Sequence, residues 1–411
     1  MPQTITITPE IREAILERGA EDAFKCYQCG TCMGACPWYQ VENVDFLTYR
    51  IPQAVKLGTI LSNEDKDQTA AEVEEIFRCV GCEACVRHCP RGVDLPDIFR
   101  AIRRILVEYE SIPQELKSVI SKVSSTGNPL GAPREKRADW AEGLDVSRFE
   151  SSMEFLYFPC CIQAYDGRGK EIARKISRIF NSAGVSFGIP GDEVVCCCES
   201  IRLAGAERIF QKSLVTNITA LKEAGVKKVV TTSPHCYSIF RQTYAELHAG
   251  LEVIDYSQLF IRLIEEKRLV PRIPLDKRVV YHDSCCLGLK NRIFDEPRRV
   301  LKSIPGLELV EIEAFTREFS LCCAGGGGGL WLDRPVEERI THVRLKQVSD
   351  TGAEILTVAC PYCLIMFEEG IKVMNLPIEV KDISELLFSS LQDTQRRSPP
   401  QECDLAGLPN S

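Results

Sequence analysis

The sequence has no excess of basic residues and no hydrophobic run long enough to cross a membrane. Lysine and arginine number 50 against 58 acidic residues, which gives a net charge of −8. Because nucleic-acid affinity depends on concentrated positive charge, this balance argues against a nucleic-acid-binding protein. The longest nearly uncharged apolar stretch, residues 355–367, is shorter than the roughly 20 residues that span a bilayer. If the protein works at a membrane, we expect a partner to hold it there.

Signal-peptide features are also missing from the N-terminus, which has no basic region, apolar segment or small-residue cleavage site. We therefore expect a cytoplasmic protein, peripheral on the inner face of the membrane only through a partner. The sequence contains 21 cysteines, and disulfides are rare in reducing cytoplasm. These cysteines thus indicate metal binding or redox chemistry. No dinucleotide-binding fingerprint is present, so neither flavin nor NAD is expected on this chain.

Two runs of cysteine near the N-terminus share one spacing. Each follows the pattern Cys-x2-Cys-x2-Cys-x3-Cys-Pro, over residues 26–37 and 79–90. This pattern is typical of paired [4Fe–4S] clusters, in which the fourth cysteine of each run binds the cluster of the other run. A duplicated run of this kind fits zinc ribbons or disulfides poorly. The predicted ligands are Cys26, Cys29, Cys32 and Cys89 for one cubane, and Cys79, Cys82, Cys85 and Cys36 for the other.

The rest of the chain repeats itself at a nearly constant offset. Three pairs of cysteines align at offsets of 125, 125 and 127 residues: Cys161 with Cys286, Cys197 with Cys322, and Cys236 with Cys363. Each copy runs from a short β-rich segment ending in cysteine, through a helical stretch, to another such segment. We predict two pseudo-symmetric α/β units with parallel sheets, whose cysteine-bearing strand ends come together.

These patterns divide the chain into domains. Apolar residues three and four apart in Pro9–Arg18 and Leu95–Glu110 predict a mainly helical N-terminal domain. Glycine, proline and charge mark a linker or a draped connection before the repeats. The predicted division is a helical ferredoxin-type domain over 1–125, a linker over 126–146, α/β units over 147–272 and 273–392, and a flexible tail over 393–411. Cys403 lies in the tail and is predicted to be a bystander thiol.

The second copy carries cysteines on three separate strand–helix turns. They are Cys285, Cys286, Cys322, Cys323, Cys360 and Cys363. Turns at one edge of an α/β sheet can bring such thiolates to one site. Gly325, Gly326 and Gly327 follow the middle pair, and glycine would let backbone N–H groups approach an inorganic core. A phosphate-binding loop is the alternative, but the run lacks the Lys-Ser/Thr of that motif, and a phosphate site has no use for two cysteines.

The first copy has lost part of this pattern. Ser233 stands where the second copy has Cys360, and Glu199 and Ser200 replace the start of the glycine run. The thiols that remain are Cys160, Cys161, Cys196, Cys197, Cys198 and Cys236. The candidate ligands among them are Cys161, Cys197, Cys198 and Cys236. This site is expected to hold a cluster or zinc, or to have lost its metal.

Residues 20–385 resemble the catalytic subunits of heterodisulfide reductases, in which a two-cluster ferredoxin module is fused to paired cysteine-rich domains of the CCG type. The resemblance rests on the two cysteine runs, the paired cysteines before the glycine run, and Cys-Pro-Tyr-Cys at 360–363. It implies a noncubane [4Fe–4S] cluster that cleaves a disulfide in two one-electron steps, with Cys322 and Cys323 as its catalytic thiolates. The implied ligands are Cys285, with or without Cys286, and Cys322, Cys323, Cys360 and Cys363. Ala324 departs from the glycine usual after the pair.

The resemblance implies an iron–sulfur oxidoreductase subunit of anaerobic metabolism. Its partners would be subunits carrying flavin or haem, with a membrane cytochrome as a further candidate. The alternative is a pure electron relay in a larger complex, such as an aromatic acyl-CoA reductase assembly or a quinone-linked membrane complex. A zinc scaffold without redox chemistry is a remote third hypothesis.

Several residues beside the cysteines have two interpretations. His235 and His282 are candidate proton donors to a released thiolate, or histidines packed at strand ends. A further group of basic residues could bind an anionic substrate, balance cluster charge, or belong to a solvated helix face. These residues are Lys290, Arg292, Arg298 and Arg299.

Overall fold

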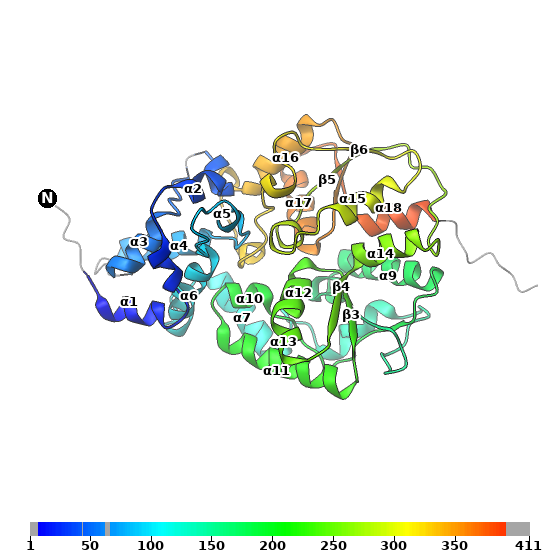
Figure 1. Ribbon diagram of the computed structural model, residues 1–411, viewed down its shortest axis with the longest axis horizontal. Helices are drawn as coiled ribbons and strands as arrows, with labels where there is room; N and C mark the ends of the chain where they lie inside the picture. The colour runs from blue at the N-terminus through cyan, green and yellow to red at the C-terminus, as the bar shows by residue number, and fades with distance from the viewer. Residues whose placement is uncertain (1–6, 43, 62–65, 392–411) are drawn as a thin grey trace, which may run out of the picture.

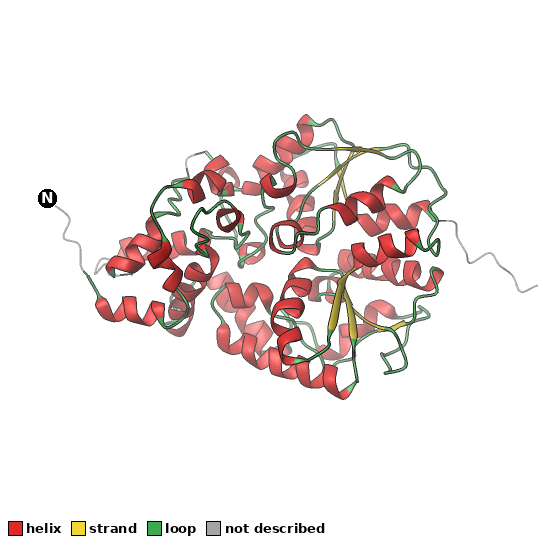
Figure 2. Cartoon of the chain, viewed as in Figure 1, coloured by secondary structure: helices red, strands yellow, loops and turns green. Residues whose placement is uncertain are grey.

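The computed structural model describes residues 7–42, 44–61 and 66–391. A helical N-terminal module lies at one end of the molecule, and two α/β units lie one above the other at the opposite end (Figure 1). Figure 2 shows the described strands confined to these two units. The prediction of a helical module followed by two α/β units is therefore confirmed. The predicted flexible tail, with Cys403, lies outside the described residues.

The N-terminal module packs around the amphipathic helix α6 (Leu95–Glu108). Asp94 caps this helix, because its side chain accepts a hydrogen bond from the amide of Asp97 at 3.0 Å. Ile98 and Ile102 on its inner face are fully buried. The other α-helices of the module are α1 (Pro9–Leu16), α2 (Thr31–Ala35), α3 (Arg50–Leu57), α4 (Lys66–Arg78), α5 (Ala84–Arg87) and α7 (Gln114–Thr126).

The connection between the module and the first α/β unit is folded against its neighbours. Asn128 is buried and donates to the carbonyl of Ala132 at 2.7 Å, which closes a turn. A 3-10 helix, Arg134–Ala141, then carries Trp140 to the ring of Tyr157 in the first strand, with centroids 5.6 Å apart. This segment is thus a draped connection.

Each α/β unit contains a four-stranded parallel sheet, and the two sheets have the same strand order. The first sheet has the order β2-β1-β3-β4 and the second β6-β5-β7-β8. Tyr157 pairs with Val230 in one sheet, and Val280 pairs with Leu356 in the other. The strands are β1 (Phe155–Phe158), β2 (Phe187–Gly188), β3 (Lys228–Thr231), β4 (Glu252–Asp255), β5 (Arg278–Tyr281), β6 (Glu308–Val310), β7 (Ile355–Val358) and β8 (Glu379–Asp382). The sequence repeat is therefore also a structural repeat.

Helices from both units pack against one another between the sheets (Figure 1). Helix α14 (Tyr256–Glu265) contacts α15 (Asp295–Lys302), and α9 (Gly167–Ser182) contacts α18 (Ile383–Ser390). The remaining α-helices of the first unit are α8 (Cys161–Tyr165), α10 (Glu199–Leu203), α11 (Glu207–Glu223), α12 (Pro234–Ile239) and α13 (Ala245–Leu247). Those of the second are α16 (Ile340–Asp350) and α17 (Pro361–Met374).

The helices α14 and α18 occupy equivalent positions and begin with equivalent capping boxes. Asp255 accepts from the amide of Ser257, and Asp382 accepts from the amide of Ser384, both at 2.9 Å. The hydroxyl of Tyr256 donates to Asp382 at 2.8 Å and so joins the two caps. The contact between the units is thus built from matching elements of the repeat.

Candidate iron–sulfur sites

Four cysteines of the N-terminal module line one cavity, and they come from both cysteine runs. These residues, called the outer site below, are Cys26, Cys29, Cys32 and Cys89. The hydroxyl of Thr48 donates to the sulfur of Cys32 at 3.3 Å, and the amide of Val93 donates to that of Cys89 at 3.4 Å. Such hydrogen bonds stabilise thiolate ligands. Cys29 is exposed, so this site lies at the surface.

The other four cysteines of the two runs form a more enclosed group. These residues, called the inner site, are Cys36, Cys79, Cys82 and Cys85. Burial raises the pKa of the Cys85 thiol well above its ordinary value, and the charges of Cys82, Cys79 and Cys36 raise it further. Burial also raises the pKa of Cys82 to about 12. Without a metal, these thiols hold their protons tightly. This is expected of buried thiols that are grouped to ligate a cation, because the cation replaces the protons.

The second unit brings its thiols together in close pairs. The sulfur of Cys285 lies 3.5 Å from that of Cys322, and the sulfur of Cys363 lies 3.2 Å from that of Cys323. Hydrogen bonds from Cys322, Cys363 and His282 lower the pKa of Cys323 well below its ordinary value, although burial opposes them. With Cys360, these four residues form what we call the second-unit site. All five members are buried cysteines, and a set of five thiol sulfurs suits iron–sulfur binding.

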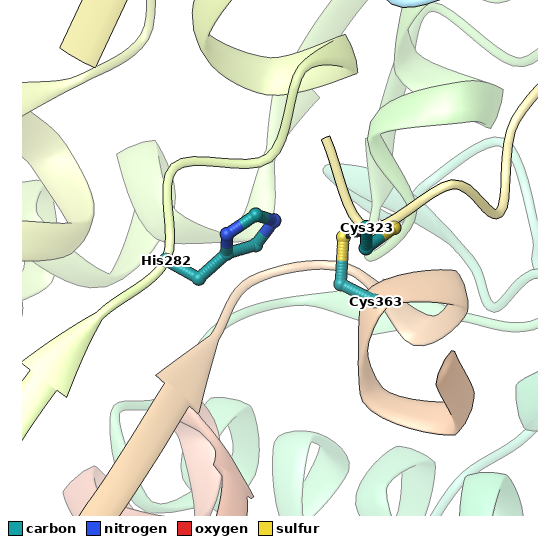
Figure 3. A group of neighbouring side chains, drawn as sticks. All are labelled: His282, Cys323 and Cys363. Carbon is teal, nitrogen blue, oxygen red and sulfur yellow. Dashed lines mark hydrogen bonds between the residues drawn. The ribbon is translucent and has the colours of Figure 1, made fainter. Parts of the chain in front are cut away.

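His282 points toward Cys323 and Cys363 (Figure 3). A ring nitrogen and the two sulfurs all lie within 4.8 Å of one another. The Nε of Arg344 donates to Nδ1 of His282 at 3.3 Å, which assigns the ring proton to Nε2. Burial lowers the pKa of this histidine and favours its neutral form. The ring can therefore donate a hydrogen bond near these thiols.

Cys286 points to the boundary between the two units. Its sulfur lies 3.4 Å from Nδ1 of His235, and that nitrogen also lies 2.7 Å from Glu199. Lys290 donates to Glu199 at 3.2 Å. The ring of Tyr362 lies against His235, with centroids 4.4 Å apart. Glu199, His235 and Cys286 could ligate a metal ion, but the buried ammonium of Lys290 beside them opposes a cation.

The first unit repeats the backbone arrangement of the second at these cysteines. The residues that correspond in the structure are shifted by one position from those that the sequence alignment pairs. The amide of Cys198 donates to the sulfur of Cys196 at 3.3 Å, as the amide of Ala324 donates to that of Cys322 at 3.3 Å. Cys198 and Ala324 both have positive φ, 60° and 71°. Cys196 is therefore the structural counterpart of Cys322, and Cys197 that of Cys323. The alignment of Cys197 with Cys322 is wrong by one position, because three consecutive cysteines fit either register.

This register decides which thiols of the first unit face one another. The sulfur of Cys197 lies 3.3 Å from that of Cys236, while Cys198 donates away from them to the hydroxyl of Ser213 at 3.2 Å. Five cysteines line the cavity of this unit, called the first-unit site: Cys160, Cys161, Cys196, Cys197 and Cys236. Cys198 is not among them. Cys160 and Cys196 line the cavity although they were not among the candidate ligands chosen from the sequence.

The glycine run lies against the N-terminal module. A Cβ on Gly326 would lie 2.5 Å from the carbonyl oxygen of Val80, and one on Gly327 would lie 2.7 Å from that of Cys79. Gly327 also has a φ of +59°. A Cβ on Gly325, in contrast, would lie 3.6 Å from the sulfur of Cys323. Close approach to an inorganic core was the predicted role, but Gly326 and Gly327 approach the main chain of the inner site instead.

The four basic residues chosen from the sequence fall into two classes. Lys290 is buried and paired with Glu199, so it is not on a solvated helix face. Arg298 is also buried and bonds both oxygens of Asp283, at 2.6 and 2.8 Å, which makes it a structural ion pair. The other two are exposed and pair with surface carboxylates: Arg292 with Glu318, and Arg299 with Glu265.

Comparison with protein families matches the N-terminal module and both α/β units. Residues 22–93 match the 4Fe-4S dicluster domain, and residues 155–241 and 279–368 each match the cysteine-rich domain. These segments contain the outer, inner, first-unit and second-unit sites. Across the described residues, no helix is long and apolar enough to cross a bilayer.

Similar proteins include two curated redox proteins and one solved structure. The EtfAB:quinone oxidoreductase of Syntrophomonas wolfei is 31% identical over 90% of this chain, which spans 58% of that protein. A dihydromethanophenazine:CoB–CoM heterodisulfide reductase chain of Methanosarcina barkeri is 29% identical over 89% of this chain and 93% of its own length. The crystal structure of a hypothetical protein from Helicobacter pylori has a similar fold, with a TM-score of 0.56 over 93% of this chain and 73% of that one, at 10% identity.

Proposed function

The chain belongs to the iron–sulfur proteins that join a 4Fe-4S dicluster domain to two cysteine-rich domains, and from this premise we propose that it is the electron-transferring subunit of a heterodisulfide-reductase-like complex. The outer and inner sites would each hold a [4Fe–4S] cubane, and the second-unit site a noncubane [4Fe–4S] cluster. When bound, such clusters accept and release single electrons.

One observation carries the proposal: cysteines from both runs line the same cavity. Cys89, the fourth cysteine of the second run, stands beside Cys26, Cys29 and Cys32 of the first. Crossing of the fourth cysteine is what a pair of neighbouring cubanes requires, and a zinc ribbon has no such need. The grouping of Cys36 with Cys79, Cys82 and Cys85 supports the same arrangement.

The proposed chemistry at the second-unit site is the reduction of a disulfide. Two electrons and two protons convert one disulfide into two thiols, so the chain must deliver protons as well as electrons. The neutral ring of His282 and the boundary residue His235 stand beside the thiols Cys323 and Cys286, where each could hold a proton. The first-unit site would hold a further metal–thiolate centre, with Cys160, Cys161, Cys196, Cys197 and Cys236 as candidate ligands.

A second candidate function is electron relay alone. Ser233 in place of a cysteine leaves the first-unit site different from the second, and a disulfide reductase that uses both centres would need both intact. The relative named as a quinone oxidoreductase is longer than this chain, which spans 58% of it, so a quinone-linked role enters only as part of this second proposal. Partners carrying flavin or haem, and a membrane cytochrome, are part of either proposal, as is a position at the cytoplasmic face.

Metal content and disulfide turnover test the proposal. Protein prepared without oxygen should contain about eight irons if only the cubanes are filled, about twelve with the second-unit centre, and about sixteen with both cysteine-rich units loaded. Reduced protein should consume an added disulfide and produce two thiols per two electrons. Full iron content without reaction toward any disulfide would favour the relay, and iron near zero would exclude both functions.

A further inference from the structure

Three buried arginines have no carboxylate partner among the described residues. Arg103, Arg137 and Arg344 are each 2% exposed or less. The fourth buried arginine, Arg298, forms ion pairs with Asp283 and Glu311. Burying a guanidinium without a counter-charge is strongly unfavourable, so an unpaired buried arginine indicates that an anion belongs nearby.

Arg103 stands beside the inner site. It donates only to carbonyl oxygens: those of Ile76 at 2.7 Å, Cys79 at 2.5 Å, Leu203 at 3.0 Å and Gly327 at 3.1 Å. These acceptors belong to all three parts of the molecule. Burial lowers the pKa of Arg103 to about 10, and the charge of Cys79 acts against that fall.

Arg137 stands beside the first-unit site. It donates to the carbonyl of Pro159 at 3.2 Å, and its guanidinium reaches the sulfur of Cys161 at 4.0 Å. The guanidinium also lies over the ring of Phe158, 4.9 Å from its centroid. Burial lowers the pKa of Arg137, but the charges of Cys161, Tyr165 and Cys196 and the hydrogen bond to Cys161 together outweigh burial, so the net shift is upward.

Arg344 stands behind the second-unit site. It donates to His282 at 3.3 Å, to the carbonyl of Phe315 at 2.8 Å and to the hydroxyl of Ser320 at 3.0 Å. The charge of Asp283 reaches Arg344, but that carboxylate already accepts two bonds from Arg298. The negative charge that would balance Arg344 is that of the thiolates beyond His282.

We propose that these three arginines are positioning residues that act as counter-charges for the inner, first-unit and second-unit sites and make the centre at each site easier to reduce. This inference rests on the proposed function, since it requires metal–thiolate centres. Reduction by one electron from a redox protein adds one negative charge and neither forms nor breaks a bond. A fixed positive charge in a buried setting favours that more negative state.

The arrangement gives the electrons a direction. The arginine at the cavity of the outer site is Arg91, which is exposed and lies over the ring of Tyr27, so solvent screens its charge. The inner site has the enclosed charge of Arg103. Arg103 therefore favours reduction of the inner cubane more than Arg91 favours reduction of the outer one, and this difference would draw an electron inward from the surface.

Redox titration of the holoprotein with EPR detection tests the proposal at Arg103. In Arg103→Gln, which removes the charge, the equilibrium constant for reducing the inner cubane should fall at least tenfold, about 59 mV for one electron. The outer cubane is the internal control and should not shift. Arg103→Lys keeps the charge but not the set of hydrogen bonds. The potential of its inner cubane should therefore equal that of the wild type. A Cys89→Ala protein, which lacks the outer cubane, assigns the two signals.

The outcomes separate this inference from the proposed function. An unchanged inner potential in Arg103→Gln, or equal shifts in the Gln and Lys variants, would overturn the counter-charge role. Arg137→Gln and Arg344→Gln give the same test at the cysteine-rich units, with lysine variants as rescue, should Arg103→Gln fail to fold. Iron near zero in the wild type would overturn the proposed function itself, whereas full iron with unshifted potentials would remove only the present inference.

Discussion

In the first unit, adjacent cysteines differ in whether they face the other thiols of the cavity. Cys198 occupies the place of Ala324 and donates to Ser213, while Cys197 faces Cys236. Replacing one of these two adjacent cysteines should therefore affect metal binding differently from replacing the other, although nothing in the sequence distinguishes them.

We predict that Cys197→Ser removes the metal proposed for the first unit and that Cys198→Ser retains it. The reason is that, of these two thiols, Cys197 lines the cavity and Cys198 does not. Iron and zinc per chain, measured after anaerobic purification, check this prediction, with Cys198→Ser as the matched control. Equal metal loss in both variants would show that the first unit binds metal in the other register.

At the outer site, Cys89→Ala should abolish one cubane and lower the iron content by about four per chain. Because Cys89 shares its cavity with Cys26 and not with the other cysteines of its own run, the cubane that survives should be the inner one. EPR spectra of the reduced protein identify the survivor, and Cys403→Ala provides a control that keeps all iron. Survival of the outer signal would contradict the crossed arrangement.

The residue scale also shows where sequence reasoning ends. Regular spacing predicts how the eight ferredoxin cysteines group, because the motif itself encodes which thiols meet, and four of them line one cavity as that grouping requires. Three consecutive cysteines, 196–198, allowed two registers, and only the fold chooses between them. Arg103, Arg137 and Arg344 belong to no local pattern, since their partners come from distant parts of the chain.

At the scale of elements, the cap of helix α14 predicts a pH effect. One oxygen of Asp255 accepts from Ser257, whereas its other oxygen, Oδ2, has no hydrogen-bond partner among the described residues. Burial accordingly raises the pKa of Asp255 from 3.8 to about 7. The folded state then binds the proton more tightly than the unfolded state does, so this group's contribution to stability is full below pH 3.8 and is lost as pH rises to about 7.

The wild type should therefore lose stability as pH rises from about 5 to about 7, by at most about 1.4 kcal/mol per pH unit from this group. Asp255→Asn should flatten that slope. Asp382, whose pKa burial raises to about 6, provides the comparison, and its Asn variant should change the slope over a window that ends about one pH unit lower. Anaerobic urea unfolding across this pH range measures both. An unchanged slope in Asp255→Asn would contradict the assignment.

The glycine run gives a second prediction for an element. Gly327→Ala adds a Cβ 2.7 Å from the carbonyl oxygen of Cys79, and should cost about 1–3 kcal/mol by pushing the loop from the N-terminal module. Gly352→Ala is the matched control, because Gly352 has a similar φ of +66° but open space around its Cβ position. Unfolding midpoints in urea compare the two. Equal losses would mean that backbone strain alone matters at Gly327.

Element type was largely predictable, but the placement of elements was not. The repeat and its β-rich segments predicted two parallel sheets because strand and helix patterns are local. The contact of the glycine run with the N-terminal module was not predicted, since the main chain that it approaches lies about 250 residues earlier in the sequence, at Cys79 and Val80.

At the scale of the whole molecule, Lys290 connects all three parts. Its ammonium lies 3.2 Å from Glu199 of the first unit and 3.8 Å from Glu83 of the N-terminal module, while Lys290 itself belongs to the second unit. Arg87 of the module also donates to the carbonyl oxygen of Lys290 at 3.2 Å.

Lys290→Met should lower the free energy of unfolding by about 3–5 kcal/mol, because it takes a buried ammonium away from the buried carboxylate of Glu199, which then has only His235 beside it. The double variant Lys290→Met with Glu199→Gln should recover much of that loss. Arg292→Gln, which breaks an exposed pair with Glu318, is the control and should cost less than about 1 kcal/mol. Anaerobic urea unfolding gives all three values. If Lys290→Met lowered the free energy of unfolding no more than Arg292→Gln does, the charge of Lys290 would not be what holds the three parts together.

The approach of Gly326 and Gly327 to the main chain at Cys79 and Val80 also bears on how the protein matures. A ribosome completes the N-terminal module well before it makes this loop, so the inner thiols remain accessible until the second unit docks on them. We therefore expect delivery of iron and sulfide to the proposed inner cubane to precede that docking. The proposed outer cubane, with Cys29 exposed, would remain within reach of such delivery after the chain has folded.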